Sequence, residues 1–582
     1  MEQCPVCGGS FQGTELICPA CGFDSSADRE QYPTLTVPKK RCQSRKEWKA
    51  QYEQNRVDVG TIFYKLSDDD TTLYVKSGVT QIEKQDVESS VKRGWLCFEE
   101  RETDNIRKVK KIVLPDTVTK IGESAFTSCW RLEEIVLGCN VREIEERAFE
   151  YCHHLQTVQI SANADEEERP IKIGDWAFAG CENLEEVLFG NSATEIGVGA
   201  FRGCKCLRRI DFLNKTKTIR ACAFQGCEAL QDVAFPEILY IARNAFSGCP
   251  AALEASAQKA AASMKDQDRF EIDGEKLLGY YGEERVVSVP QGIKVIGKRS
   301  FFNNDIVEEV ILPEGLLEIE CCAFQGCINL CQIQLLESLE EIGEGAFCDC
   351  SSLLEIQIPD RVEIIKDSTF FECKSLKTVH LGKCTKELQN GAFDGCIDLQ
   401  WIQIPDSVKA IGDGAFLQCA ALRQIDLPDG LKEIEGSVFC GCSALERIDL
   451  PDSIEKIGRH AFRGCSALTR ISIPDNVKEI GECTFEECTA LKKVKLPSHL
   501  KTIEHGTFEN CTSLRTIRIP AEVQYIEYKA FYGCSALWRV IFEGKLPRIR
   551  STAFGMCRSL LDPRFWKVKE KYDPKVRRIR WQ

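Results

Sequence analysis

This sequence of 582 residues lacks any apolar run long enough to span a lipid bilayer, for which a helix needs about 20 consecutive apolar residues. It also lacks an excess of positive charge, because its net charge of −14 argues against a general nucleic-acid binder. Histidine is scarce, with 6 residues, and the catalytic patterns GxxxxGK[ST], HExxH and GxSxG are all absent. These absences make an enzyme the least supported class of protein.

Cysteine, by contrast, is abundant, with 33 residues. In a secreted chain such a count would indicate a disulfide framework. Here the first cysteine, Cys4, already belongs to a metal-binding pattern, which leaves little room before it for the basic and apolar regions of a signal peptide. We therefore expect a cytoplasmic protein with mostly reduced thiols.

The dominant feature is a repeat of about 23 residues. The stretch CSALERIDLPDSIEKIGRHAFRG, residues 442–464, is followed at once by CSALTRISIPDNVKEIGECTFEE. A phenylalanine followed three residues later by cysteine marks each unit, except that Asn304 replaces the cysteine after Phe301. The step from Phe149 to Phe178 is longer and carries the acidic loop NADEEERP. The marker phenylalanines are Phe126, Phe149, Phe178, Phe201, Phe224, Phe246, Phe301, Phe324, Phe347, Phe370, Phe393, Phe416, Phe439, Phe462, Phe485, Phe508, Phe531 and Phe554.

Each unit predicts a strand followed by a turn. Ile448 and Leu450 are two residues apart and share one strand face, and Pro451 ends the strand because it has no N–H to donate. The segment from Ala461 to Cys465 reads as a short helical turn with one buried side. One unit cannot bury its own apolar residues, but stacked units can, so the sequence predicts a repeat solenoid.

The pattern CxxLxxIxIPxxVxxIGxxAFxx resembles the BspA-like class of leucine-rich repeats over about residues 110–560. The resemblance implies a curved solenoid of short parallel β-strands joined by turns or short helices, with a sheet face that binds macromolecules. Members of this class are often bacterial surface proteins, and the missing export signal is a departure from that picture.

Seventeen repeat cysteines are predicted to occupy one interior column. We favour simple packing, because a free cysteine behaves as a small buried hydrophobic residue. Disulfides between coils are an alternative that needs specific geometry, and a metal-binding ladder is the least favoured interpretation.

The array is interrupted near residues 250–290, where PAALEASAQKAAASMK predicts a short helix and FEIDGEKLLGYYGEERVVSVP predicts short strands with turns. BspA-like proteins often restart their repeats with a similar D-G-x-L-x-x-Y-x-G segment. The predicted organisation is a zinc ribbon at 1–24, a polar linker at 25–56, an N-terminal cap or degenerate repeat at 57–104, repeat block 1 at 105–250, a spacer at 251–290, repeat block 2 at 291–560 and a basic C-terminal cap or tail at 561–582.

The N-terminal stretch CPVCGGSFQGTELICPACG predicts one structural zinc ion bound by Cys4, Cys7, Cys18 and Cys21. Two CxxC pairs supply four thiolates, which complete a tetrahedral shell and leave no open position for catalysis. The stretch resembles a bacterial zinc ribbon of the CPxCG type, a class that contacts either nucleic acid or protein.

Outward strand positions are the candidates for partner binding, because the repeat does not fix them. Residues 57–557 carry 58 basic and 79 acidic side chains, a balance of −21, whereas residues 558–582 carry 9 and 3, a balance of +6. Two exposed tryptophans would suit a binding surface, although Trp538 packing under the C-terminal cap is an equal alternative, and a merely solvating surface is another. The candidates are Trp401, Trp538, Lys492, Lys493, Lys495, Arg515, Arg518 and Arg539.

The sequence thus predicts a non-enzymatic scaffold that binds a protein or another macromolecule. A partner that docks at the basic C-terminal end is expected to be acidic. Two alternatives stay open. One is a cell-surface adhesin exported by an unconventional route, and the other is a nucleic-acid binder that uses the ribbon and the basic tail.

Overall fold

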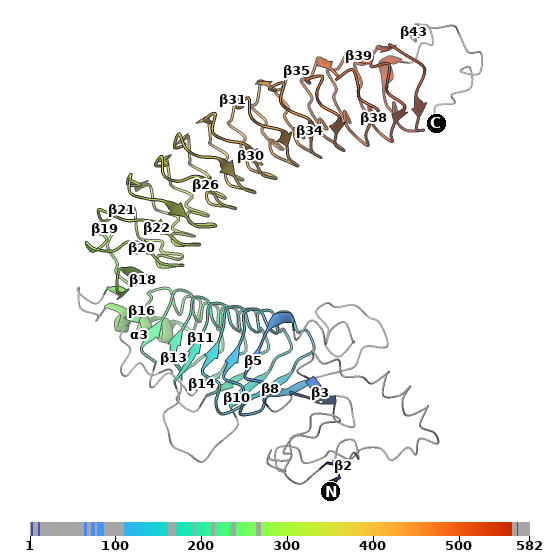
Figure 1. The fold of residues 1–582 in the computed structure, drawn as a ribbon. Coiled ribbons are helices and arrows are strands. Elements are labelled where there is room, and N and C mark those ends of the chain that lie inside the picture. The colour runs from blue at the N-terminus through green and yellow to red at the C-terminus, as the bar shows by residue number, and fades with distance from the viewer. Residues whose placement is uncertain are drawn as a thin grey trace, which may run out of the picture. The chain divides into compact units, whose positions relative to one another are not determined.

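The computed structural model describes residues 63–66, 72–75, 78–85, 110–160, 170–189, 193–210, 216–231, 233, 240–262 and 269–560, together with the strand backbones at 2–3, 10–11 and 567–568. The chain divides into two compact units, Met1–Arg269 and Phe270–Gln582, each built of short strands that stack coil upon coil (Figure 1). Within the described residues, no helix combines the length and the apolar character that a membrane span requires.

The first unit contains two seven-stranded sheets, one for each strand of a coil, and all pairs within them are parallel except the antiparallel β3–β4 pair. One sheet runs in the order β14-β12-β10-β8-β6-β4-β3 and comprises Arg209–Ile210, Glu186–Leu188, Thr157–Ile160, Glu134–Leu137, Lys111–Val113, Thr72–Val75 and Phe63–Leu66. The other runs β16-β15-β13-β11-β9-β7-β5 and comprises Tyr240–Ile241, Thr218–Ile219, Ala193–Ile196, Ile171–Ile173, Glu143–Ile144, Lys120–Ile121 and Gln81–Ile82. Separately, β1 (Glu2–Gln3) and β2 (Ser10–Phe11) form an antiparallel pair.

Helix α3, Ala251–Ala262, follows the last coil of the first unit and confirms the helix expected there. The second unit begins with the antiparallel strands β17 (Phe270–Asp273) and β18 (Lys276–Tyr280), which confirm the short strands expected after the helix.

The coils of the second unit each contribute one strand to each of two rows. The first row contains β19 (Val286–Ser288), β21 (Glu309–Ile311), β23 (Gln332–Ile333), β25 (Glu355–Gln357), β27 (Thr378–His380), β29 (Trp401–Gln403), β31 (Gln424–Asp426), β33 (Arg447–Asp449), β35 (Arg470–Ser472), β37 (Lys493–Lys495), β39 (Thr516–Ile519), β41 (Arg539–Phe542) and β43 (Lys567–Val568). The second row contains β20 (Val295–Ile296), β22 (Glu318–Ile319), β24 (Glu341–Ile342), β26 (Ile364–Ile365), β28 (Glu387–Leu388), β30 (Ala410–Ile411), β32 (Glu433–Ile434), β34 (Lys456–Ile457), β36 (Glu479–Ile480), β38 (Thr502–Ile503), β40 (Tyr525–Ile526) and β42 (Arg548–Ile549), and the 3₁₀ turn η4 spans Arg558–Leu560.

The strand pattern of each coil places one side chain inside and its neighbours outside. In β33, Ile448 is buried between the exposed Arg447 and Asp449, as the period of two residues predicts. Parallel pairing in register, such as Ile425 with Ile448, stacks equivalent residues of successive coils on one another. The predicted repeat solenoid with units of about 23 residues is therefore confirmed.

The arc around each marker phenylalanine is a series of turns rather than the short helical turn expected for Ala461–Cys465. Alternate N–H groups leave their own coil and bond to the next one: Ser437 to the carbonyl of Arg459 at 2.9 Å, and Phe439 to the carbonyl of Ala461 at 2.8 Å. A helix would keep those N–H groups within the segment. Ser437 and Gly441, on either side of Phe439, adopt positive φ angles of 53° and 76°, which bend the chain around the ring.

Phenylalanine and cysteine form two continuous columns inside each unit. Neighbouring marker rings stack at centroid distances such as 5.1 Å for Phe126–Phe149 and 5.7 Å for Phe416–Phe439. All 17 repeat cysteines are buried in one column, as the packing interpretation predicts. From Cys152 onward each thiol also donates a hydrogen bond to the carbonyl of the phenylalanine one coil earlier, for example Cys465 to Phe439 at 3.1 Å. A buried carbonyl is thereby satisfied by a side chain that is otherwise apolar.

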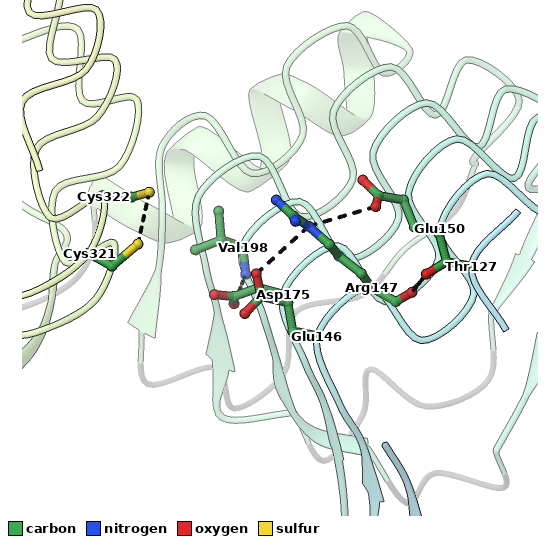
Figure 2. Close-up of polar contacts among 8 residues, drawn as sticks. All are labelled: Thr127, Glu146, Arg147, Glu150, Asp175, Val198, Cys321 and Cys322. Carbon is green, nitrogen blue, oxygen red and sulfur yellow. Dashed lines mark hydrogen bonds and ion pairs between the residues drawn. The ribbon is translucent and has the colours of Figure 1, made fainter. Parts of the chain in front are cut away.

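Side chains at the rim of the coils add polar ties between neighbours. In the first unit the Asp175 carboxylate accepts the N–H of Val198 at 2.7 Å, and Thr127 donates to the carbonyl of Arg147 at 2.6 Å (Figure 2). Arg147 also lies 3.7 Å from the Glu150 carboxylate (Figure 2). The two hydrogen bonds join successive coils at the rim, whereas the Arg147–Glu150 ion pair lies within one coil.

Candidate partner-binding face

Three adjacent strands of the first row bring seven of the eight predicted residues together. Strands β37, β39 and β41 lie side by side, with Thr516 opposite Arg539 and Arg518 opposite Ile541. We call the outward side chains of these three coils the late-coil patch: Lys492, Lys493, Lys495, Arg515, Thr516, Arg518, Trp538, Arg539 and Ile541. Six of these nine side chains are basic and none is acidic, so the predicted basic candidates converge on one surface.

Most of the positive charge in the late-coil patch is not neutralised locally. Lys495 lies 3.5 Å from Asp475, and Arg518 lies 3.6 Å from Glu543. Within the described part of the chain, no ion pair is made by the other four basic side chains, Lys492, Lys493, Arg515 and Arg539. With strands about 4.8 Å apart, the patch is roughly 10 Å across, close to the Debye length at physiological salt, so its charges act together on an approaching ligand.

Acidic side chains at the equivalent outward positions of earlier coils behave differently. Glu133 and Glu134 are ion-paired with Lys110 and Lys111 of the preceding coil at 2.6 and 2.7 Å. In the second unit, Glu308 lies 2.8 Å from Arg285. Ion pairs with the preceding coil thus compensate these three charges, unlike the four basic side chains of the late-coil patch that make no ion pair within the described residues.

The two tryptophans are both exposed but lie in different places. Trp538 belongs to the late-coil patch and is 40% exposed. Trp401, also 40% exposed, lies on β29, and its ring contacts His380 at a centroid distance of 5.3 Å. Four strand steps separate β29 from β37, which corresponds to roughly 19 Å. The structure therefore does not bring Trp401 into the patch.

A shallow hollow of about 380 Å³ adjoins the patch at Lys495. It is lined by Asp449, Leu450, Asp452, Ser472, Pro474, Asp475, Asn476 and Lys495. The Ser498 N–H, which donates to Asp475 at 3.0 Å, and the nearby Lys495 ammonium hold the pKa of the Asp475 carboxyl below its usual range. The edge of the late-coil patch beside Lys495 therefore carries the negative charge of Asp475, and the basic surface ends there.

Two side-chain clusters were not predicted from the sequence. The members of the first come from neighbouring repeats, and those of the second are adjacent in the sequence. His460, Cys483 and Glu486 place possible metal-ligating atoms within 4.8 Å of one another, although Glu486 is already ion-paired with Arg463 at 3.1 Å. Cys321 and Cys322 place their sulfur atoms 3.3 Å apart. A search of each column for equivalent positions 23 residues apart would have found the first cluster.

The predicted zinc ligands Cys4, Cys7, Cys18 and Cys21 lie outside the described residues, as do the linker at 25–56 and most of the predicted tail at 561–582. The zinc site stays a prediction from the sequence.

Comparison with known families gives a match to the BspA type leucine rich repeat region, a model of 6 copies. The matches cover residues 98–169, 167–266, 281–400, 386–502 and 455–573, which together make up most of the chain. Among curated proteins, no relative matches this chain.

Solved structures of leucine-rich repeat proteins are similar in parts. A leucine-rich repeat protein from Bacteroides ovatus is 22% identical, with 86% of this chain and 91% of that chain covered and a TM-score of 0.33. A leucine rich cell surface protein from Faecalibacterium prausnitzii is 23% identical, with 75% and 93% covered and a TM-score of 0.31. The leucine-rich repeat protein of T. pallidum is 28% identical, with 35% and 90% covered and a TM-score of 0.28.

Proposed function

Because this chain belongs to the BspA type leucine-rich repeat family, whose members are generally binding scaffolds, we propose that it is a non-enzymatic scaffold that binds an acidic protein partner through the late-coil patch. The observation that carries the proposal is the cluster of basic side chains on three adjacent strands, four of them without an ion pair in the described part of the chain. A compact basic surface steers an acidic partner toward it and speeds association.

Trp538 gives the patch an apolar anchor beside its charges. Tryptophan is enriched among the residues whose truncation costs most binding energy, because it buries a large rigid surface. Arginine and lysine around such an anchor supply hydrogen bonds to carboxylates, and arginine does so in a bidentate manner. The partner is therefore expected to present Asp or Glu side chains around an apolar contact.

The test is affinity capture from nuclease-treated lysate of the source cells, followed by quantitative mass spectrometry. The variant Lys492→Glu/Lys493→Glu/Lys495→Glu should lose the partner that the wild-type protein captures. The matched control Lys383→Glu/Lys409→Glu/Lys501→Glu changes the net charge by the same amount at exposed positions outside the patch, which make no ion pair within the described residues, and should retain that partner. Equal capture of every protein by both variants would refute the proposal.

Addition of salt gives a second readout. Binding to the patch should weaken as the salt concentration rises, because the charges are exposed and screened. A ligand that is captured from untreated lysate but not from nuclease-treated lysate would favour the nucleic-acid alternative over a protein partner.

We also propose that Cys4, Cys7, Cys18 and Cys21 hold one structural zinc ion. The two CxxC pairs support this, since four thiolates form the closed tetrahedral set that structural zinc prefers. Elemental analysis of the purified protein should give one zinc per chain, which the Cys4→Ser/Cys7→Ser variant loses. Iron in place of zinc, or no metal in the wild-type protein, would contradict the proposal.

For location, we propose the cytoplasm, on the reasoning that a reduced compartment suits the free thiols of the repeat columns. Protease treatment of intact source cells tests this. Protection of the protein supports the proposal, whereas digestion from outside would favour the adhesin alternative.

A further inference from the structure

Two adjacent cysteines stand apart from the buried columns. Cys321 and Cys322 follow β22 and open the arc before Phe324, and their sulfur atoms lie 3.3 Å apart in a thiol–thiol contact (Figure 2). Both are partly exposed, unlike Cys327 in the buried column of the same coil. The pair is therefore reachable from solvent while its two sulfur atoms are already in contact.

Two glycines of the next coil lie against the pair. A Cβ atom on Gly343 would fall 2.3 Å from the backbone nitrogen of Cys321, and one on Gly345, in the column of Cys322, would fall 3.4 Å from the sulfur of Cys322. A side chain on Gly345 would therefore lie against the Cys322 sulfur, whereas Gly343 lets the two backbones approach closely. Both cysteines stay partly exposed beside these small residues.

The preceding coil supplies positive charge. One repeat earlier, Lys298 and Arg299 occupy the columns of Cys321 and Cys322, and Arg299 donates its N–H to the Cys321 carbonyl. The next coil places one acidic residue, Glu344, in the column of Cys321. The two cations, Lys298 and Arg299, outnumber the one anion, Glu344, and this favours the ionised form of the Cys321 thiol.

The pKa of Cys321 is lowered to about 7, first by the hydrogen bond from the Cys322 thiol and then, against the opposing effect of burial, by Arg299 and Lys298. The same contact raises the pKa of Cys322. Nearby, burial raises the pKa of Cys348 to about 11, so that thiol stays protonated. In such a pair the thiolate can react first as a nucleophile, and the neighbouring thiol can then convert its oxidised form into a disulfide.

We propose that Cys321 and Cys322 form an oxidisable dithiol site whose co-substrate is a hydroperoxide, ROOH. The Cys321 thiolate attacks the terminal peroxide oxygen, the O–O bond breaks, and ROH leaves after taking up a proton, so that Cys321 becomes a sulfenic acid. The Cys322 sulfur then attacks the Cys321 sulfur, the S–O bond breaks, and water leaves with the thiol proton. In sum, two thiols and ROOH give one disulfide, ROH and water.

The product is expected to be easy to reduce. Adjacent Cα atoms across a trans peptide are 3.8 Å apart, whereas unstrained disulfides join Cα atoms about 4.4–6.8 Å apart. A ring closed at the shorter spacing stores strain, and strained disulfides are the labile ones. The site is therefore a reversible modification site rather than a structural crosslink.

Oxidation of the full-length reduced protein with hydrogen peroxide tests the proposal. After the remaining thiols are alkylated under denaturing conditions, cleavage at glutamate releases residues 321–337, which contain Cys321, Cys322, Cys327 and Cys331. We expect this peptide to lose two alkylation sites, both restored by a monothiol. In Cys322→Ser, Cys321 should instead be trapped as a sulfenic acid by a cyclic dione, and the control Cys331→Ser should behave as wild type.

The pH dependence separates this site from an ordinary thiol. At pH 6 a thiol with a pKa near 7 is about one-tenth ionised, so Cys321 should be alkylated faster than the exposed Cys331. Lys298→Gln should reduce that advantage, because it removes one of the two cations. The proposal is overturned if Cys321 is oxidised no faster than Cys331, or if its disulfide partner is any cysteine other than Cys322.

Discussion

Replacing Phe370 by alanine should open the core of the second unit at one coil. The Phe370 side chain is fully buried, and its ring stacks on Phe347 at 5.5 Å and on Phe393 at 5.4 Å. Removal of a fully buried phenylalanine ring costs about 3–5 kcal/mol, through lost transfer energy and the cavity left behind. Because the ring has a stacking partner on both sides, we expect about 4 kcal/mol for Phe370→Ala.

The adjacent Phe371 provides a matched control, because it allows the same substitution one residue away. Its side chain lies outside the ring column and is partly exposed, so Phe371→Ala should cost about 1–2 kcal/mol. The difference of at least about 2 kcal/mol between the variants corresponds to a factor of roughly 30 in the local opening equilibrium.

Hydrogen exchange in the native state is the appropriate assay, because a repeat array need not unfold in a single step. The amides to follow are those that bond between coils, namely Phe347 to the Thr369 carbonyl and Phe370 to the Ala392 carbonyl, both at 2.9 Å. Phe370→Ala should accelerate their exchange far more than Phe371→Ala. Equal acceleration by both variants, or a cost below about 2 kcal/mol for Phe370→Ala, would refute the role assigned to the ring column.

Three further outcomes follow from the structure. In the native protein, the exposed thiols of Cys331 and Cys384 should react with a thiol reagent, whereas the buried column cysteines should react only after denaturation; early labelling of the column would contradict the packing. Burial, and then the Glu372 carboxylate, raise the pKa of Asp394 to about 6, so the native state favours the protonated form and this contribution to stability is lost as the pH rises through about 6. Asp394→Asn should therefore be about 1 kcal/mol more stable than wild type at pH 7.5, allowing for partial exposure, and equally stable at pH 4, as urea unfolding at both pH values would show. Gly464→Ala should cost about 1 kcal/mol in urea unfolding, because a Cβ atom would make only ordinary contact with Gly441, at 3.6 Å from its Cα, but φ is +72°; a stabilised variant would contradict this.

The architecture could be predicted because each coil repeats the same buried and strand-ending positions. Ile448 on the inner strand face, the proline after the strand and the phenylalanine–cysteine pair each recur at one period, and only stacked coils bury all of them. The arc was predicted wrongly as a helical turn, since local sequence does not reveal that alternate N–H groups bond to the next coil. Residues such as Gln418, with a φ of 62°, accept a left-handed conformation that their own propensity disfavours, because stacking overrides it.

The candidate site was predicted as a set of residues but not as a surface. Lys492, Arg515 and Arg539 lie at outward repeat positions, which the period of the strand reveals. That these charges make no ion pair with the described residues, while Glu133 and Glu134 are paired with lysines one coil earlier, depends on which residues the register places side by side. The lowered pKa of Cys321 was also hidden in part, because it depends first on the contact with Cys322 and then on Arg299 and Lys298, one repeat earlier in the sequence.

The residues that stabilise a coil and those proposed to bind a partner lie at different positions of that coil, so each set can be substituted separately. The interior positions, such as Phe485 and Cys488, are fixed by contacts with both neighbouring coils. The outward positions of the same coil, Lys492 and Lys493, are exposed and make no ion pair in the described part of the chain. Exposed substitutions away from such contacts usually change stability by less than about 0.5 kcal/mol, so charge reversal in the late-coil patch should test binding without unfolding the coil that presents it.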